Sequence, residues 1–143
     1  MTDQAEIAVR NLMTSWSDRD RADVGAYLSD DAVFFNGPRG VYHGAETITA
    51  LFRRNLSVTS WFDVDIKALV SDGHTVMVER IDKFEIDGKR FGMELVGVFD
   101  VADDGRITRW REYYDFRTFQ TELEAAGLPS GPRAEVRIEG DRM

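Results

Sequence analysis

The sequence contains no cysteine and only 2 histidines among its 143 residues. The absence of cysteine excludes disulfides, thiolate nucleophiles, iron–sulfur clusters and cysteine-ligated zinc. His43 and His74 are each isolated and adjacent to predicted loops, so we predict no metal site. The sequence has no nucleophile-elbow motif that would support Ser/His/Asp catalysis. No glycine-rich phosphate loop occurs either. We therefore expect neither a metal centre nor a nucleotide cofactor.

Long hydrophobic runs and an excess of basic charge are also missing. No apolar run approaches the roughly 18 residues that a membrane helix needs, and the acidic start does not resemble a signal peptide. The 26 acidic residues outnumber the 18 basic ones, which gives a formal net charge of −8. This charge opposes binding to nucleic acid or to an anionic membrane surface. We expect a cytoplasmic protein that acts on a small neutral molecule.

The length fits one ordinary domain, and no internal repeat or linker occurs before the C-terminal part of the chain. A content of 43% hydrophobic and 31% charged residues is typical of a globular protein and excludes a disordered or fibrous one. We predict a single domain over residues 1–128 and a C-terminal tail over residues 129–143.

The hydrophobic period changes from about 3.6 to 2 near residue 60. Helices followed by hairpin-linked strands are typical of an α+β domain, in which the helices cover the apolar face of a curved sheet and leave a pocket between the layers. The predicted helices span residues 5–16, 20–28, 45–56 and 118–126, and the predicted strands span residues 32–35, 62–70, 75–86, 90–101 and 106–115.

Large apolar side chains on the predicted outer face of the sheet indicate a homodimer, because single domains rarely leave such patches bare. The alternative is that the C-terminal arm covers some of them. These residues are Trp61, Leu69, Trp110, Tyr114 and Phe116.

Charged residues stand within a strand that is otherwise apolar. Alternation along residues 76–84 places Arg80 and Asp82 on one strand face, with valine and phenylalanine on either side. If this is the core face, burial of the pair would shift pKa values strongly. Met77 and Ile81 give the other face an apolar character too, so a solvent-facing ion pair stays open, and the pattern alone favours it.

Two further polar residues stand at strand ends. Asp115 has the position of a helix N-cap, and strict alternation places it in the polar row of Tyr113 rather than in the apolar row. Other strand carboxylates, Glu112 among them, show that such residues are not rare here. Asn36 begins an Asn-Gly-Pro turn, which is a sufficient structural role by itself.

Residues 79–82 (Glu-Arg-Ile-Asp), 95–99 (Leu-Val-Gly-Val-Phe) and 105–116 resemble the limonene-1,2-epoxide hydrolase family. Residues 31–44 align with the same family without a gap, and the likeness covers about residues 5 to 128. The resemblance implies the cone-shaped α+β fold of nuclear transport factor 2, ketosteroid isomerase and SnoaL-like cyclases. In this fold a curved mixed sheet carries three N-terminal helices on its concave face.

In that family, an Asp-Arg-Asp triad and two water-positioning residues open an epoxide in one step. Carried over by position, Arg80 is the central arginine, Asp82 the general acid, Asp115 the general base and Asn36 a water-positioning residue. The second positioning residue of the family is a tyrosine, and Phe34 stands in its place. A hydroxyl from another residue would have to replace it, and the candidates are Tyr27, Tyr42 and Tyr113.

The resemblance implies a small apolar epoxide as substrate, water as the second reactant and a vicinal diol as product, without a cofactor. A rival hypothesis keeps the fold and uses one aspartate as a lone base for isomerisation, cyclisation or dehydration. A third is a non-catalytic binding module, because this fold has many unrelated roles. Convergence of both aspartates on Arg80 would favour the hydrolase. The residues expected to line an apolar pocket are Leu12, Trp16, Phe34, Val78, Leu95 and Phe99.

Overall fold

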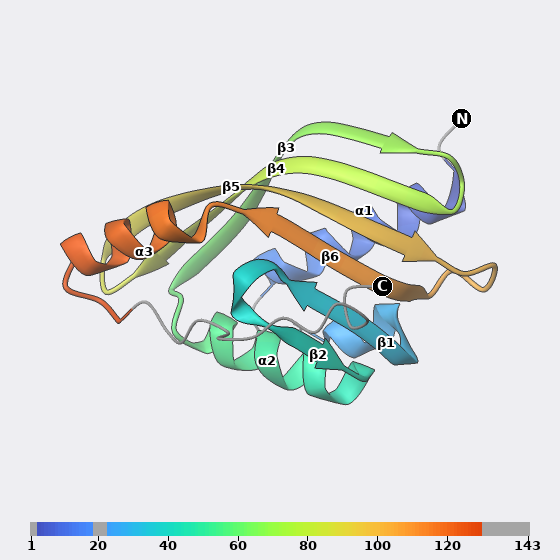
Figure 1. The fold of residues 1–143 in the computed structure, drawn as a ribbon, viewed down its shortest axis with the longest axis horizontal. Coiled ribbons are helices and arrows are strands. Elements are labelled where there is room, and N and C mark those ends of the chain that lie inside the picture. The colour runs from blue at the N-terminus through green and yellow to red at the C-terminus, as the bar shows by residue number, and fades with distance from the viewer. Residues whose placement is uncertain (1–2, 19–22, 130–143) are drawn as a thin grey trace.

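The computed structural model describes residues 3–18 and 23–129, which form three α-helices, two short 3-10 helices and a six-stranded sheet (Figure 1). The helices are α1 (Gln4–Ser17), α2 (Ala45–Ser57) and α3 (Phe116–Ala125), with 3-10 turns at Val24–Tyr27 and Gly37–Arg39. The strands are β1 (Leu28–Asn36), β2 (Val41–His43), β3 (Trp61–Ser71), β4 (Thr75–Ile86), β5 (Lys89–Val101) and β6 (Ile107–Tyr114).

The sheet has the order β2-β1-β6-β5-β4-β3. Strands β3 to β6 form an antiparallel meander, and β1 joins it through a parallel pairing with β6. The β4–β5 hairpin turns at Asp87 and Gly88, which have φ angles of 51° and 76°. Both angles suit the primed turns that close two-residue hairpins. This turn fixes the register that places Arg80 opposite Leu95.

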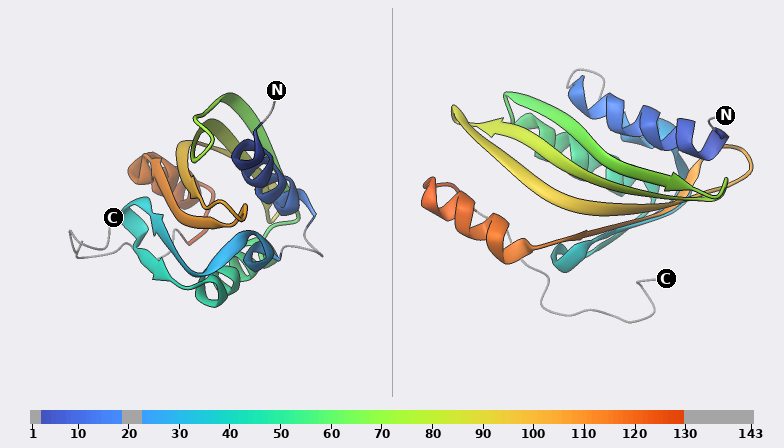
Figure 2. Two further views of the ribbon diagram at one scale, coloured as in Figure 1. Left: turned by 90° about the vertical axis from the view of Figure 1, so that its right-hand side faces the viewer. Right: turned by 90° about the horizontal axis from the view of Figure 1, so that it is seen from above.

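Helices α1 and α2 supply the apolar cover of one sheet face, which is the inner face of the domain. Asp3 caps α1 by accepting a hydrogen bond of 2.7 Å from the backbone N–H of Glu6. The helix then buries residues at helical spacing, Leu12 and Trp16 among them, mainly against β3. Helix α2 packs on β1. Figure 2 shows both helices on the same side of the curved sheet.

The predicted α+β class with a curved mixed sheet is confirmed. One helix differs from the prediction. Within the described residues, the predicted helix over residues 20–28 is only the 3-10 turn Val24–Tyr27. A Cβ on Gly25 would lie 2.8 Å from the Thr49 hydroxyl oxygen, so this segment is held tightly against α2. Strand β2 was not predicted. The predicted tail lies outside the described residues, except for residue 129.

The prediction for the outer sheet face is wrong for most of its residues. Trp110 is 1% exposed and lies in the core, Leu69 packs against that core, and Phe116 is buried. The prediction failed because both side-chain rows of β6 carry aromatic residues, so the pattern did not reveal which row faces inward. Tyr114 also lies on the inner row, and only Trp61 is outward-facing, with the Arg90 guanidinium over its ring.

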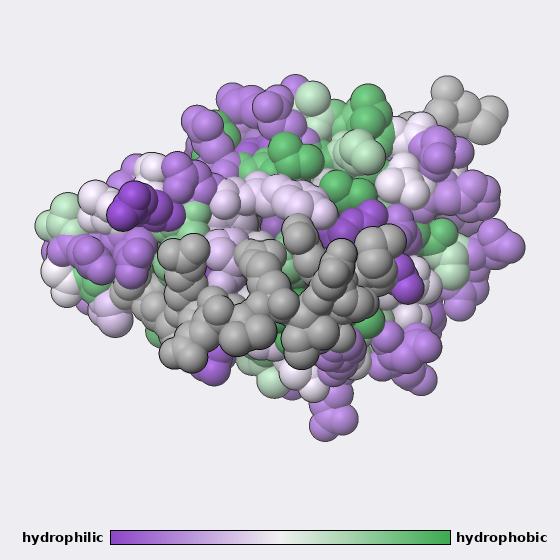
Figure 3. Space-filling model, viewed as in Figure 1, coloured by the Kyte–Doolittle hydropathy of each residue, from purple (hydrophilic) through white to green (hydrophobic). Residues whose placement is uncertain are grey.

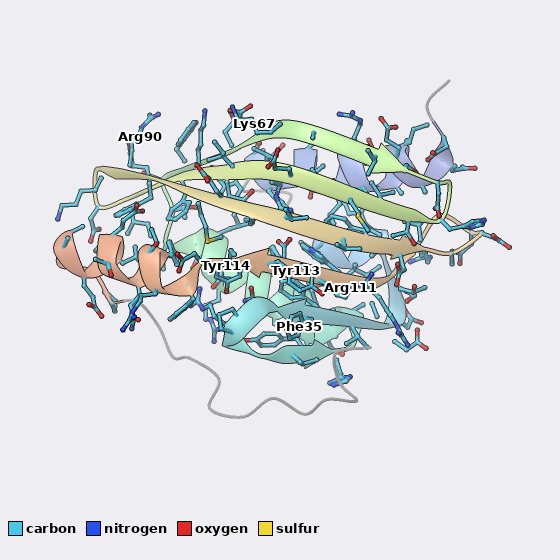
Figure 4. All side chains as sticks on the ribbon, turned by 45° about the horizontal axis from the view of Figure 1, so that its top comes forward. Phe35, Lys67, Arg90, Arg111, Tyr113 and Tyr114 are labelled. Carbon is cyan, nitrogen blue, oxygen red and sulfur yellow. The ribbon has the colours of Figure 1, made fainter. Side chains whose placement is uncertain are left out.

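The outer face carries a different apolar set. Met77, Val96 and Tyr113 are exposed there, and the Phe35 and Tyr113 rings lie 6.0 Å apart. Figure 4 labels Phe35 and Tyr113 on neighbouring strands. Figure 3 shows hydrophobic side chains over β3 and β4, with hydrophilic ones around them. No helix in the described part of the chain is long and apolar enough to cross a membrane.

Candidate functional site

One buried arginine binds two buried carboxylates at the centre of the inner face. Arg80 Nε and Nη2 donate to the two Asp82 carboxylate oxygens at 2.8 and 3.3 Å. Arg80 Nη1 and Nη2 donate to the two Glu112 oxygens at 3.1 and 2.5 Å. All three residues are nearly inaccessible, at 1% exposure for Arg80 and 6% for each carboxylate. One guanidinium therefore joins both carboxylates through paired hydrogen bonds.

The strand register explains how these residues meet. Arg80 and Asp82 share one row of β4, as alternation predicted. That row faces inward, although the sequence pattern alone favoured a solvent-facing ion pair, and Glu112 is on the inner row of β6. Strand β5 runs between them and contributes Gly97, which pairs with Glu112. A Cβ on Gly97 would lie 2.6 Å from Arg80 Nη1 and 2.7 Å from Glu112 Oε2. The missing side chain leaves the space in which Arg80 reaches Glu112.

Burial dominates the electrostatics of this cluster. Burial raises the pKa of Glu112 above its ordinary value, and the Asp82 charge adds to this, while Arg80 opposes it. Burial alone would lower the pKa of Arg80, but the charges of Asp82 and Glu112 raise it overall, so the guanidinium stays charged. Two ionised carboxylates and one guanidinium would leave a net charge of −1 in an apolar environment. Retention of one proton by the pair of carboxylates removes that charge.

Aromatic rings enclose the cluster on the helical side. The Trp16 ring lies over the Arg80 guanidinium, with 5.1 Å between the guanidinium carbon and the ring centroid. Trp16 also stacks on Trp110, with centroids 5.6 Å apart. The Trp16 indole N–H is buried without a hydrogen-bond acceptor in the described part of the chain. The Trp110 indole N–H is buried without an acceptor there as well, so this aromatic face of the cluster carries two indole donors.

All six residues predicted to line an apolar pocket are buried on this side of the sheet. Five of them belong to the hydrophobic core cluster, and the sixth pairs with Arg80 across the β4–β5 register. Their contact with a substrate stays a prediction. They are Leu12, Trp16, Phe34, Val78 and Phe99 in the cluster, and Leu95 beside Arg80.

The structure does not bring Asp115 to Arg80. Its carboxylate is exposed and caps α3, accepting from the Thr118 backbone N–H at 3.1 Å and the Thr118 hydroxyl at 2.7 Å. These hydrogen bonds hold the pKa of Asp115 below its ordinary value. The chain leaves the sheet after Tyr114, so Asp115 follows the last inward-facing position. Glu112 supplies the second carboxylate, and its inner-row spacing from Trp110 was the signal that could have identified it.

Asn36 lies beside Glu112 because the two residues are register partners in the parallel β1–β6 pairing. The hydroxyl that contacts Asn36 comes from Tyr114, whose Oη lies 3.2 Å from Asn36 Oδ1 and 3.2 Å from the Asn36 carbonyl oxygen. Sequence reasoning named three other tyrosines and missed this one. Tyr113, one of the three, is on the exposed outer face.

The described residues contain no group of three or more histidine, cysteine, aspartate or glutamate side chains that could hold a metal ion. The arrangement at Arg80 offers a proton donor and a proton acceptor held by one cation. Such a pair can protonate one reacting atom while it deprotonates another.

Comparisons with known proteins identify the family of this chain. Residues 3–124 match the limonene-1,2-epoxide hydrolase catalytic domain. The chain is 37% identical over 128 residues to the epoxide hydrolase EphG of Mycobacterium tuberculosis, covering 86% of this chain and 84% of that protein. It is also similar to the structure of an LEH-like epoxide hydrolase from M. tuberculosis, with a TM-score of 0.74 and 33% identity, covering 85% of this chain and 90% of the other.

More distant structures share the fold alone. A putative SnoaL-like polyketide cyclase from Shewanella putrefaciens CN-32 superimposes with a TM-score of 0.76 at 16% identity, covering 87% of this chain and 99% of the other. The expected fold family is thereby confirmed. The match to the catalytic domain covers most of the chain, and so does the likeness to EphG. The chain therefore belongs to the limonene-1,2-epoxide hydrolase family and is an epoxide hydrolase of that type.

Proposed function

We propose that this enzyme adds water to a small apolar epoxide in one step and releases a vicinal diol, with Asp82, Arg80 and Glu112 as its catalytic triad. The observation that carries the proposal is the single buried guanidinium held between two carboxylates. Glu112 replaces Asp115 in the triad that the resemblance implied, because Asp115 is exposed and serves as a helix cap.

In the proposed step, the pair of carboxylates retains one proton, and Asp82 is the acid while Glu112 is the base. A water oxygen forms a bond to one epoxide carbon while the bond from that carbon to the epoxide oxygen breaks. Glu112 accepts one proton from the water, and Asp82 donates its proton to the epoxide oxygen. Return of a proton from Glu112 to Asp82, by way of solvent, restores the starting state. Relief of ring strain supplies driving force for the opening.

The position of Asn36 supports this division of roles. Its register places it beside Glu112, so a water bound by Asn36 would lie near that carboxylate. The raised pKa of Glu112 also makes its ionised form a stronger base than an ordinary glutamate. Asp82 lies on the other side of Arg80 and is the carboxylate left to act as the acid.

An apolar epoxide suits the aromatic and aliphatic side chains around the cluster. Trp16, which lies over Arg80, would offer a substrate its unpaired indole N–H. A lone-base isomerase is less well supported, because two carboxylates converge on Arg80 rather than one. A binding module with Arg80 turned to solvent is disfavoured by the burial of this residue.

The proposed assembly is a homodimer that uses the outer face of the sheet. Met77, Val96 and Tyr113 are apolar or aromatic, exposed and on adjacent strands. A second copy of the chain would bury this face.

The test is the conversion of limonene oxide and cyclohexene oxide in 18O-labelled water under single-turnover conditions. We expect label in the diol of the first turnover, because water attacks the epoxide directly. Asp82→Asn and Glu112→Gln should each abolish the reaction, whereas Asp115→Asn should retain it as the matched control. The absence of diol from folded wild-type enzyme would refute the proposal. Loss of activity in Asp115→Asn with activity retained in Glu112→Gln would refute the assignment of the base.

A further inference from the structure

Tyr114 of β6 contacts Asn36, the residue proposed to bind the hydrolytic water. It is two residues after Glu112, on the same inner row, and its hydroxyl meets the Asn36 side chain and carbonyl on the neighbouring strand. Phe34, two residues before Asn36 on β1, has no hydroxyl to offer. Figure 4 labels Tyr114 beside Tyr113, its outward-facing neighbour on β6.

The local backbone leaves space for the Tyr114 ring. Gly37 has a φ of 50°, in the left-handed region that glycine adopts readily. A Cβ at this position would lie 2.9 Å from Tyr114 Cε1 and 3.2 Å from the Glu112 carbonyl oxygen. The Asn-Gly sequence at the end of β1 therefore does more than turn the chain. It lets a phenol ring pack closely over the backbone that follows Asn36.

The Tyr114 hydroxyl can act only as a neutral donor or acceptor under ordinary conditions. Burial raises the pKa of Tyr114 above its ordinary value, although nearby Arg39 opposes the shift. Both Asn36 atoms within 3.2 Å of Oη are oxygens, so the hydroxyl donates to them. With the amide oxygen engaged in this way, the amide nitrogen is the group that Asn36 presents to a water beside Glu112.

We propose that Tyr114 is a positioning residue for the hydrolytic water, because its hydroxyl fixes the orientation of the Asn36 amide next to Glu112. The inference rests on the proposed function. It assigns to β6 both the base and the group that orients the water, so the β1–β6 pairing assembles this half of the site.

The test compares Tyr114→Phe with Tyr113→Phe, which removes a hydroxyl from the adjacent, outward-facing residue. We expect Tyr114→Phe to lower kcat by about tenfold with little change in KM, the usual effect of losing one hydrogen bond in the transition state. Tyr113→Phe should keep wild-type kcat. Thermal unfolding of both variants verifies that each is folded at the assay temperature.

A double-mutant cycle with Asn36→Ala separates positioning from a structural role. If Tyr114 acts through Asn36, the double variant loses no more activity than Asn36→Ala alone. The inference would be overturned if the two single-variant losses of kcat multiplied in the double variant, or if Tyr114→Phe kept the wild-type kcat. The proposed function would stand in either case. Absence of diol from the wild-type enzyme would overturn the proposed function, and the inference with it.

Discussion

Arg80 and Glu112 are hydrogen-bonded across an intervening strand, with Arg80 Nη2 2.5 Å from Glu112 Oε1. They come from β4 and β6, and the strand between them passes through Gly97 at the crossing point. Side chains two strands apart seldom meet, because a residue of the central strand fills the space between them. The contact here depends on the absence of a side chain at one position, and that dependence can be tested.

Gly97→Ala should separate Arg80 from Glu112, since its Cβ would lie within 2.7 Å of both groups. We expect kcat to fall by roughly a hundredfold and the free energy of unfolding to fall by about 1–3 kcal/mol. Gly92→Ala on the same strand is the matched control, because its Cβ would contact only Ile81, at an ordinary 3.4 Å. Steady-state kinetics and urea unfolding measure both effects. Equal behaviour of the two variants would contradict the prediction.

Replacement of the buried cation Arg80 should lower the free energy of unfolding much more than replacement of a cation in a partly exposed ion pair. Arg80→Met leaves Asp82 and Glu112 buried without a counter-charge, so the free energy of unfolding should fall by about 3–5 kcal/mol. Arg111→Met removes the partner of Asp100 in a half-exposed ion pair, and should cost about 1 kcal/mol or less. Chemical denaturation at neutral pH compares them. A similar loss in both variants would mean that burial does not strengthen the Arg80 contacts.

The sequence predicted those features of the site that depend on local spacing. Alternation along β4 placed Arg80 and Asp82 on one face, because side-chain direction in a strand is set by the backbone. It did not identify that face as the inner one, since Met77 and Ile81 make the other row apolar as well. The last helix was predicted within two residues at its start, from Asp115 and the apolar residues that follow it.

The features that depend on pairing between distant strands were not predicted. The contact between Asn36 and Tyr114 joins residues 78 positions apart, through a parallel pairing that has no local turn signal. The carboxylate that contacts Arg80 from β6 is Glu112, a contact that the sequence did not reveal. The resemblance led to Asp115, whereas the inner row of β6 ends with Glu112 and Tyr114.

A single charge on the outer face should disrupt the proposed dimer. Val96 is 37% exposed and pairs with Tyr113 across β5 and β6, at the middle of the apolar set. Val96→Glu would bury an unpaired carboxylate in the interface, so dimerisation should weaken by roughly a hundredfold or more. Val58→Glu, at the end of α2 and away from the sheet face, is the control. Sedimentation velocity over a concentration series measures the effect, and a monomeric wild type would refute the dimer.

The pH dependence of activity and of stability should run in opposite directions because of Glu112. Its pKa is raised in the folded enzyme, so the folded state keeps a proton that the unfolded chain has already lost. As pH rises from the ordinary glutamate pKa through the raised one, the unfolded state binds fewer protons, and the free energy of unfolding falls. Over the same interval Glu112 ionises and becomes a base, so kcat/KM rises.

Glu112→Gln isolates this group. The variant has no proton to lose at position 112, so it should lack the decrease in the free energy of unfolding that Glu112 causes. The unfolding free energies of the variant and the wild type should therefore diverge above the ordinary glutamate pKa. Asp115→Asn, which replaces an exposed carboxylate whose pKa is lowered, should show the opposite sign relative to the wild type, at lower pH. Urea unfolding at a series of pH values measures both. Parallel curves for the wild type and Glu112→Gln would mean that Glu112 titrates alike in the folded and unfolded states, and that burial does not tune this carboxylate as a base.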